Sequence, residues 1–85
     1  MDVIETLPLR CPCCQHKTIG ERAAYLICPV CFWEDDGQDD VEADEIWGGP
    51  NGELSLTQAR VNYQLFGAYC RRVLSHVRPP LPHEL

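Results

Sequence analysis

The chain has 85 residues, of which 24% are charged, and a net charge of −6. A single domain of this size removes only about 60–65% of its unfolded surface from water, so its hydrophobic core alone leaves it marginally stable. Its apolar runs are far shorter than the roughly 20 residues that cross a bilayer, which excludes a membrane-spanning protein.

The N-terminal sequence indicates the compartment. Residues 1–5 have neither the basic region nor the long apolar stretch of a secretory signal, so we expect a cytoplasmic protein. In a reducing compartment, paired cysteines are metal ligands or redox thiols more often than structural disulfides. The six cysteines are therefore the first candidates for the stabilisation that a small core lacks.

The charges are divided unevenly along the chain. Residues 1–54 hold twelve acidic and three basic residues, giving −9, whereas residues 55–85 hold one acidic residue and four arginines, giving +3. Binding to nucleic acid relies on Lys and Arg that neutralise phosphates, so a net acidic chain is a poor candidate for it. A basic protein is the expected partner of the acidic part.

Two short strands are predicted between the cysteine pairs. Residues 17–19 and 24–27 include β-branched and aromatic residues, and residues 20–22 between them have the composition of a turn. These segments predict a β-hairpin. Residues 11–33 should therefore form a hairpin that carries one cysteine pair at each end.

Residues 34–53 are predicted to form an acidic loop and a turn. Residues 34–45 contain eight carboxylates and no base, and their repulsion and low hydrophobicity disfavour packing. The loop is either simply solvated, a docking surface for a basic partner, or a calcium site, although the EF-hand pattern of Gly at position six and Glu at position twelve is missing. The candidate partner-binding residues are Asp35, Asp36, Asp39, Asp40, Glu42 and Asp44.

Residues 55–77 are predicted to be helical. Ser55 is a suitable N-cap with Gln58 as its capping-box partner, so the helix should begin at the residue after Ser55. Gly67 interrupts the pattern at a cost of about 1 kcal/mol relative to Ala, and we expect a kink or a break there. The prolines of residues 78–85 predict an extended tail. An apolar stripe recurs at helical spacing and consists of Ala59, Tyr63, Phe66, Cys70, Val73 and Val77.

The aromatic residues are expected to pack together. Phe32 and Trp33 directly follow the last cysteine of the second pair, and the simplest role for them is packing beside the cysteines. Trp47, with Tyr63 and Phe66, should extend that core; the alternative is an exposed aromatic surface for recognition.

Four cysteines are spaced as metal ligands. Cys11 and Cys14 form one C-x2-C pair and Cys28 and Cys31 another, with thirteen residues between the pairs. Two residues between thiolates let a tight turn, or knuckle, aim both sulfurs at one ion, and two knuckles complete a tetrahedron with Zn–S bonds of about 2.3 Å. Four thiolates leave no position for water, so we expect one structural Zn²⁺.

Other uses of the cysteines stay open. Iron in the same four-cysteine site would make a rubredoxin-like electron-transfer protein, and thiols that cycle through disulfides would make a thiol redox protein. Cys13 and His16 also have a ligand-like spacing and are an alternative to Cys11 and Cys14. As a non-ligand, Cys13 is a bystander, and Cys70 is a small apolar residue of the helix stripe.

These motifs together resemble the bacterial cysteine-rich CPCC family. The resemblance covers about residues 9–82 and rests on Cys11-Pro12-Cys13-Cys14, on residues 27–36 around the second pair, and on residues 48–67. It implies a metal-binding protein and says little about function. One departure is Gln15, where the family often has Gly; because Gly eases the turn after a knuckle, Gln15 implies a tighter or altered first knuckle.

The sequence therefore predicts a small α+β protein with one domain over residues 1–85. We expect a zinc-ribbon-like or rubredoxin-like β-hairpin with two cysteine knuckles, followed by a C-terminal helical segment. No catalytic constellation is visible, so the expected function is a non-enzymatic, zinc-stabilised protein-interaction module. One version is an immunity-type inhibitor that covers a basic toxin with its acidic loop. The alternatives are the redox protein and, with less support, a zinc ribbon that binds nucleic acid through Arg60, Arg71, Arg72 and Arg78.

Overall fold

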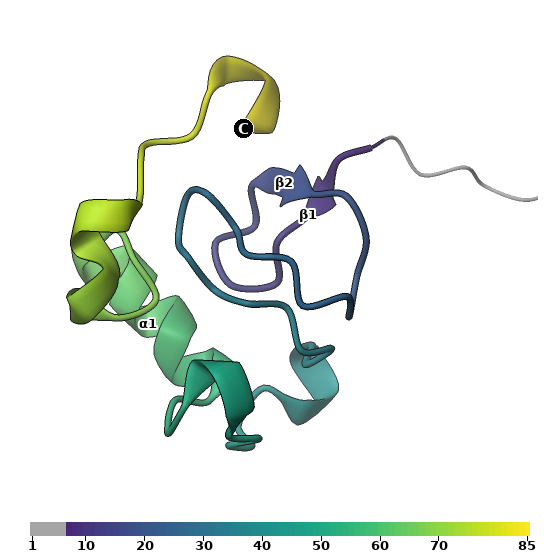
Figure 1. Ribbon diagram of the computed structural model, residues 1–85, viewed down its shortest axis with the longest axis vertical. Coiled ribbons are helices and arrows are strands. Elements are labelled where there is room, and N and C mark those ends of the chain that lie inside the picture. Colours follow the sequence, from purple (N-terminus) through teal and green to yellow (C-terminus); the bar gives the residue numbers. More distant parts are fainter. Residues whose placement is uncertain (1–6) are drawn as a thin grey trace, which may run out of the picture.

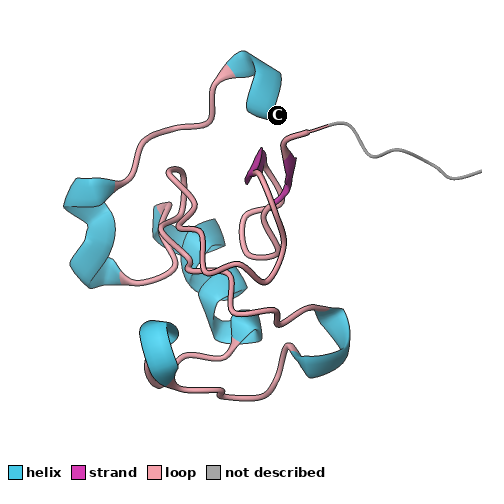
Figure 2. Ribbon diagram, turned by 45° about the vertical axis from the view of Figure 1, so that its right-hand side comes forward, coloured by secondary structure: helices cyan, strands magenta, loops and turns pink. Residues whose placement is uncertain are grey.

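The structure is a computed structural model that describes residues 7–85. These residues form a small α+β fold with a two-stranded antiparallel sheet and one α-helix, joined mostly by loops (Figures 1 and 2). Within residues 7–85, no helix has the length and apolar character needed to cross a membrane. In chain order the elements are β1 (Leu9–Arg10), β2 (Lys17–Ile19), 3₁₀ helices at Asp40–Glu42 and Gly49–Asn51, α1 (Leu56–Phe66), and 3₁₀ helices at Arg71–His76 and Pro82–Glu84.

The sheet encloses the first cysteine pair. Leu9 of β1 lies opposite Ile19 of β2, and Arg10 lies opposite Lys17, with an irregularity between the two positions. The turn between the strands is closed by two backbone bonds at Cys11, whose N–H donates to the His16 carbonyl at 2.9 Å and whose carbonyl accepts from the Gln15 N–H at 2.8 Å. The first knuckle is therefore the turn of a short β-hairpin.

The predicted strand over residues 24–27 is wrong. Only Ile27 of that segment makes a β-bridge, and its partner is Glu34 on the far side of the second cysteine pair. Inside this bridge the Cys28 N–H donates to the Trp33 carbonyl at 3.0 Å. Each pair of cysteines thus has its own hairpin, whereas the sequence predicted one hairpin between the pairs. The apolar residues that favoured a strand lie on the surface, where Tyr25 is 57% exposed.

The predicted exposure of the acidic loop is wrong for its first part. Asp35 and Gln38 are fully buried. The Asp35 carboxylate accepts hydrogen bonds from Arg22 Nε at 2.7 Å and from the backbone N–H groups of Ala23 at 2.9 Å and Gly37 at 3.1 Å. The Gln38 amide donates to the carbonyls of two later residues of the same loop. The loop therefore folds around its own buried polar groups.

Two arginines from outside the acidic loop neutralise part of its charge. Arg22 also reaches Asp39 at 2.8 Å, and Arg60 of α1 reaches Asp40 at 2.8 Å. The ion pair with Arg22 lowers the pKa of Asp39. Arg60 Nε in addition donates to the Pro12 carbonyl at 2.8 Å. Arg60 thereby joins the helix, the acidic loop and the first knuckle, which offsets the repulsion that the sequence pattern implied.

The helix begins at Leu56 and breaks at Gly67, as the sequence predicted. The Ser55 hydroxyl caps it by accepting from the Gln58 N–H at 3.0 Å. The capping box is half formed, because the Gln58 side chain donates to Asn62 instead of returning to Ser55. Gly67 has φ of 89°, a left-handed conformation that glycine adopts without a Cβ penalty, and it ends α1. The rest of the predicted helical segment contains the 3₁₀ helix at Arg71–His76.

The core forms where both hairpins meet the C-terminal half. Trp33 is fully buried, and its ring meets the Tyr69 ring edge-on with centroids 5.7 Å apart. Tyr63 and Phe66 pack at the edge of this core, as expected. The expectation for Trp47 is wrong, because its side chain is 47% exposed and its indole N–H donates to the Glu45 carboxylate.

The C-terminal tail folds back over the first hairpin. Its last turn, Pro82–Glu84, contacts β2, and Figure 1 shows the chain end beside the two strands. The buried Glu84 carboxylate accepts two bonds from Arg78 and one from the Leu81 N–H, and its pKa falls to about 2 because of these partners. The extended part predicted for residues 78–85 therefore ends at a 3₁₀ turn.

The burial of Asp35 generates a stability prediction. Asp35→Asn should lower the free energy of unfolding by about 3 kcal/mol, because it removes the charge from a buried, hydrogen-bonded ion pair. Asp40→Asn is the matched control, since it also removes one charge, but its side chain is 83% exposed and surface pairs contribute less than about 1 kcal/mol. Denaturant unfolding of both metal-loaded variants measures the difference. Equal effects would contradict the structural role of Asp35.

Candidate metal centre

Four sulfur atoms from the two knuckles form one compact cluster. The Sγ atoms of Cys11, Cys14, Cys28 and Cys31 all lie within 4.8 Å of one another. Across the two hairpins, Cys11 Sγ lies 3.6 Å from Cys31 Sγ, and Cys14 Sγ lies 3.7 Å from Cys28 Sγ. A regular tetrahedron with metal–sulfur bonds of about 2.3 Å has edges of about 3.8 Å, so the spacing fits a single four-coordinate ion.

The two turns aim their sulfurs through tight backbone geometry. Gln15 and Phe32 are at equivalent places, each directly after the second cysteine of its pair, and both have positive φ, 68° and 71°. Each donates its N–H to the carbonyl of the first cysteine of the pair, at 2.8 Å in both knuckles. Gln15 thus adopts the left-handed conformation that Gly would adopt more easily, so the departure from CPCCG leaves the turn intact.

Two backbone N–H groups and one hydroxyl lie close to the sulfurs of the second knuckle. The Val30 N–H lies 3.4 Å from Cys28 Sγ, and the Trp33 N–H lies 3.5 Å from Cys31 Sγ. The Thr18 hydroxyl lies 3.0 Å from Cys28 Sγ. Thr18 is a functional residue that sequence reasoning missed, because its place on β2 becomes informative only when the second knuckle is positioned against it.

Because the cluster is buried, an uncompensated charge there would cost free energy. Cys11, Cys28 and Cys31 are fully buried and Cys14 is 5% exposed. Hydrogen bonding to a neighbouring thiol, together with burial, raises the pKa of Cys11 and of Cys31 far above the usual range, whereas hydrogen bonds from the other thiols lower that of Cys28. Burial and the proximity of the other thiols therefore oppose ionisation of most of these sulfurs in the absence of a cation. A bound cation is what allows all four to be thiolates at once.

The structure does not bring the alternative ligand pair into the cluster. Cys13 is buried but is not part of the four-sulfur cluster, and neither is His16. The His16 ring instead meets Tyr63 edge-on, with centroids 6.0 Å apart. Cys70 is a half-buried free thiol at the edge of the core. Among residues 7–85, no histidine or carboxylate joins the four sulfurs.

The six candidate partner-binding acids do not form one surface. Asp35 is buried and is therefore not available to a partner, while Asp39 and Asp40 are paired with arginines. Asp36 accepts from the Gln38 N–H, Glu42 accepts from the Asp39 N–H, and Asp44 accepts from the Thr57 hydroxyl. Only part of the predicted acidic surface thus remains free for docking.

The arrangement is suited to holding an ion and not to activating a substrate. Four buried sulfurs fill the positions of a tetrahedral ion, so such an ion has no site for water or substrate. The chemistry that the cluster supplies is a cross-link between two hairpins separated in sequence by thirteen residues.

Substitution of single cysteines distinguishes ligands from bystanders. Cys11→Ser, Cys14→Ser, Cys28→Ser and Cys31→Ser should each abolish stable metal binding and leave the chain largely unfolded, because a small metal domain depends on its ion. Cys13→Ser and Cys70→Ser are the matched controls and should each keep one ion per chain. Metal analysis and circular dichroism provide the measurements. If the Cys11→Ser variant kept the ion and the Cys13→Ser variant lost it, Cys13 would be assigned as the ligand in place of Cys11.

Comparison with known proteins identifies the family. The searches of curated proteins and of solved structures gave no significant match. A family model described as cysteine-rich CPCC matches residues 9–84, which include both knuckles, the acidic loop and the helical segment. The chain therefore belongs to the cysteine-rich CPCC family.

Proposed function

We propose that the protein is a non-enzymatic interaction module stabilised by one structural Zn²⁺. The observation that carries the metal proposal is the closed cluster of four buried sulfurs at tetrahedral spacing. Zinc suits this donor set because it favours tetrahedral thiolate sites and has no redox chemistry. The two hairpins around the ion support the zinc-ribbon-like or rubredoxin-like comparison made from the sequence. A reducing cytoplasm would keep the thiols available for the ion.

Iron in the same site is the second candidate, and a specific observation favours it. Two backbone N–H groups donate to the sulfurs of Cys28 and Cys31, and the Thr18 hydroxyl lies at hydrogen-bond distance from Cys28 Sγ. Hydrogen bonds to sulfur tune the reduction potential of iron–thiolate sites. In that case the protein would transfer electrons as rubredoxin does.

Metal analysis of protein purified without oxygen separates the two metals. For the zinc protein we expect one Zn²⁺ per chain, no colour, and four thiols that react only after unfolding in chelator. Cys13 and Cys70 should account for the other two thiols. One iron per chain, with reversible bleaching on reduction, would overturn the zinc proposal. Oxidised cysteine pairs without metal would instead favour a thiol redox protein.

The interaction proposal rests on the later part of the acidic loop. In residues 41–47, which we call the acidic–apolar segment, Val41 is 90% exposed, Ile46 63% and Trp47 47%. Asp44 and Glu45 of the same segment are also exposed and form no ion pair within residues 7–85. A large aromatic residue beside a charged rim is the usual composition of a binding hot spot.

The charge of this segment favours a basic protein partner. An acidic surface speeds encounter with a basic one and excludes acidic competitors. An immunity-type inhibitor that covers the basic cleft of a toxin is one partner relationship that this charge fits. Nucleic acid fits less well, because two of the four C-terminal arginines, Arg60 and Arg78, are paired with Asp40 and Glu84.

Affinity capture with charge-matched variants tests the interaction. Asp44→Asn with Glu45→Gln should reduce binding of a basic partner by tenfold or more, because two complementary charges are lost. Glu21→Gln with Glu53→Gln removes the same charge from exposed positions outside the segment and should keep the binding. For a toxic partner, co-expression with the natural protein should relieve the toxicity, and the first double variant should fail to do so. Unchanged partners in both variants would contradict docking through this segment.

A further inference from the structure

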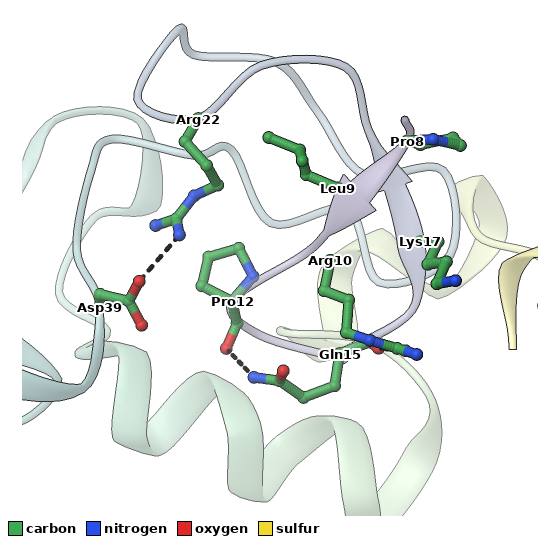
Figure 3. Close-up of a pocket in the computed structure, with 8 residues that line it drawn as sticks. All are labelled: Pro8, Leu9, Arg10, Pro12, Gln15, Lys17, Arg22 and Asp39. Atoms are coloured by element: carbon green, nitrogen blue, oxygen red, sulfur yellow. Dashed lines mark hydrogen bonds and ion pairs between the residues drawn. The ribbon is translucent and has the colours of Figure 1, made fainter. Parts of the chain in front are cut away.

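A concave pocket lies between the first hairpin and the side chains of Arg22 and Asp39, and no cysteine lines it. Its volume is about 560 Å³, within the range of pockets that take small molecules. Figure 3 shows Arg10 and Lys17 at one end of it and Arg22 with Asp39 at the other. The lining residues are Pro8, Leu9, Arg10, Pro12, Gln15, Lys17, Arg22 and Asp39.

The two cations at one end of the pocket are direct neighbours. Arg10 of β1 and Lys17 of β2 are opposite each other in the register of the hairpin, and both line the same pocket. Like charges directly opposite on paired strands destabilise a sheet. The structure therefore places two repelling cations on one short hairpin, in a protein whose net charge is −6.

No acid of the described part of the chain compensates these two charges. Within residues 7–85, neither Arg10 nor Lys17 forms an ion pair. Arg10 uses one guanidinium nitrogen to donate to the Gln15 carbonyl at 2.6 Å, which fixes the side chain along the wall of the pocket. A guanidinium has five N–H donors and an ammonium has three, so most donors of the pair remain free for a ligand.

The other end of the pocket holds an acid that is engaged in ion pairs. Asp39 would repel an anion, but it lies 2.8 Å from Arg22, which also pairs with Asp35, and 4.0 Å from Arg60. The side chain of Gln15 donates to the Pro12 carbonyl at 3.1 Å, so this amide is also in use. Pro8, Leu9 and Pro12 add apolar wall. The pocket thus combines a cationic end with a partly apolar remainder whose one acid is held in ion pairs.

We propose that this pocket binds a phosphoryl group, held by Arg10 and Lys17. A guanidinium fork and an ammonium are the two side-chain groups that bind phosphate most often, the first as a bidentate partner and the second as a point charge. A phosphate with two negative charges balances the two cations, whereas a carboxylate balances one. The remaining volume accommodates the small organic part of a phosphorylated molecule. Neither a cysteine nor a residue of the acidic–apolar segment lines this site, so the proposal does not depend on which metal the cluster takes.

Titration of the metal-loaded full chain with inorganic phosphate, followed by amide chemical shifts at low ionic strength, tests the site. We expect saturable shifts in residues 9–22. Arg10→Gln with Lys17→Gln should weaken binding at least tenfold, because two charge-assisted hydrogen-bonding groups are lost. Arg71→Gln with Arg72→Gln is the matched control: it removes the same charge from two exposed arginines elsewhere and should change the affinity less than twofold. Asp2 and Glu5, which lie outside the described residues, are unchanged in the natural protein and in both double variants. Their charges therefore contribute equally to all three measurements.

Three results would overturn the proposal. The first is an absence of saturable shifts with phosphate in the natural protein. The second is an equal loss of affinity in the two double variants, which would assign the effect to net charge alone. The third is binding of acetate as tight as that of phosphate, which would make the site a general carboxylate site. Unchanged metal content and circular dichroism show that each variant is folded, so a loss of binding reports on the pocket.

Discussion

The fold depends on bringing four sulfurs within 4.8 Å of one another. Both hairpins are short, since β1 and β2 are two and three residues long and the second knuckle has one β-bridge, and an isolated two-stranded hairpin is marginally stable at best. A cation shared by both knuckles would replace the many contacts that a larger core supplies. The Tyr69 N–H donates to the Cys31 carbonyl at 2.9 Å, so the second knuckle also anchors the chain after α1.

Ion pairs between separate segments of the chain hold the loops and the tail around the sulfur cluster. Arg22, Arg60 and Arg78 each come from a different part of the chain, and each pairs with an acid from another element or from the tail. The acidic loop folds because buried Asp35 has a cation and two backbone donors as partners. Most of these acidic side chains are thus neutralised within the protein, whereas Asp44 and Glu45 of the acidic–apolar segment form no ion pair within residues 7–85.

Short-range sequence patterns were sufficient to predict the helix and the sulfur cluster. They did not predict the structure of the loops. The cap at Ser55, the break at Gly67 and the C-x2-C spacing each depend on neighbours in sequence, and all appear in the structure. The error at residues 24–27 arose because apolar residues in a thin domain need not be buried. The burial of Asp35 depends on Arg22, thirteen positions away, and no pattern of single residues identifies such a pair. Long-range partners also decide the roles of Thr18 and Arg60.

The connection between the knuckles affects how an ion enters and leaves. Thirteen residues separate Cys14 from Cys28, so an ion caught by one knuckle meets the other at an effective concentration of the order of millimolar or higher. The second pair of sulfurs then binds in an intramolecular step. Release of the ion would require both cysteine pairs to dissociate from it before either pair binds it again. This holds even though each pair alone is a weak chelator. An ion held by both knuckles would therefore leave slowly, and the fold would persist through brief shortages of free metal.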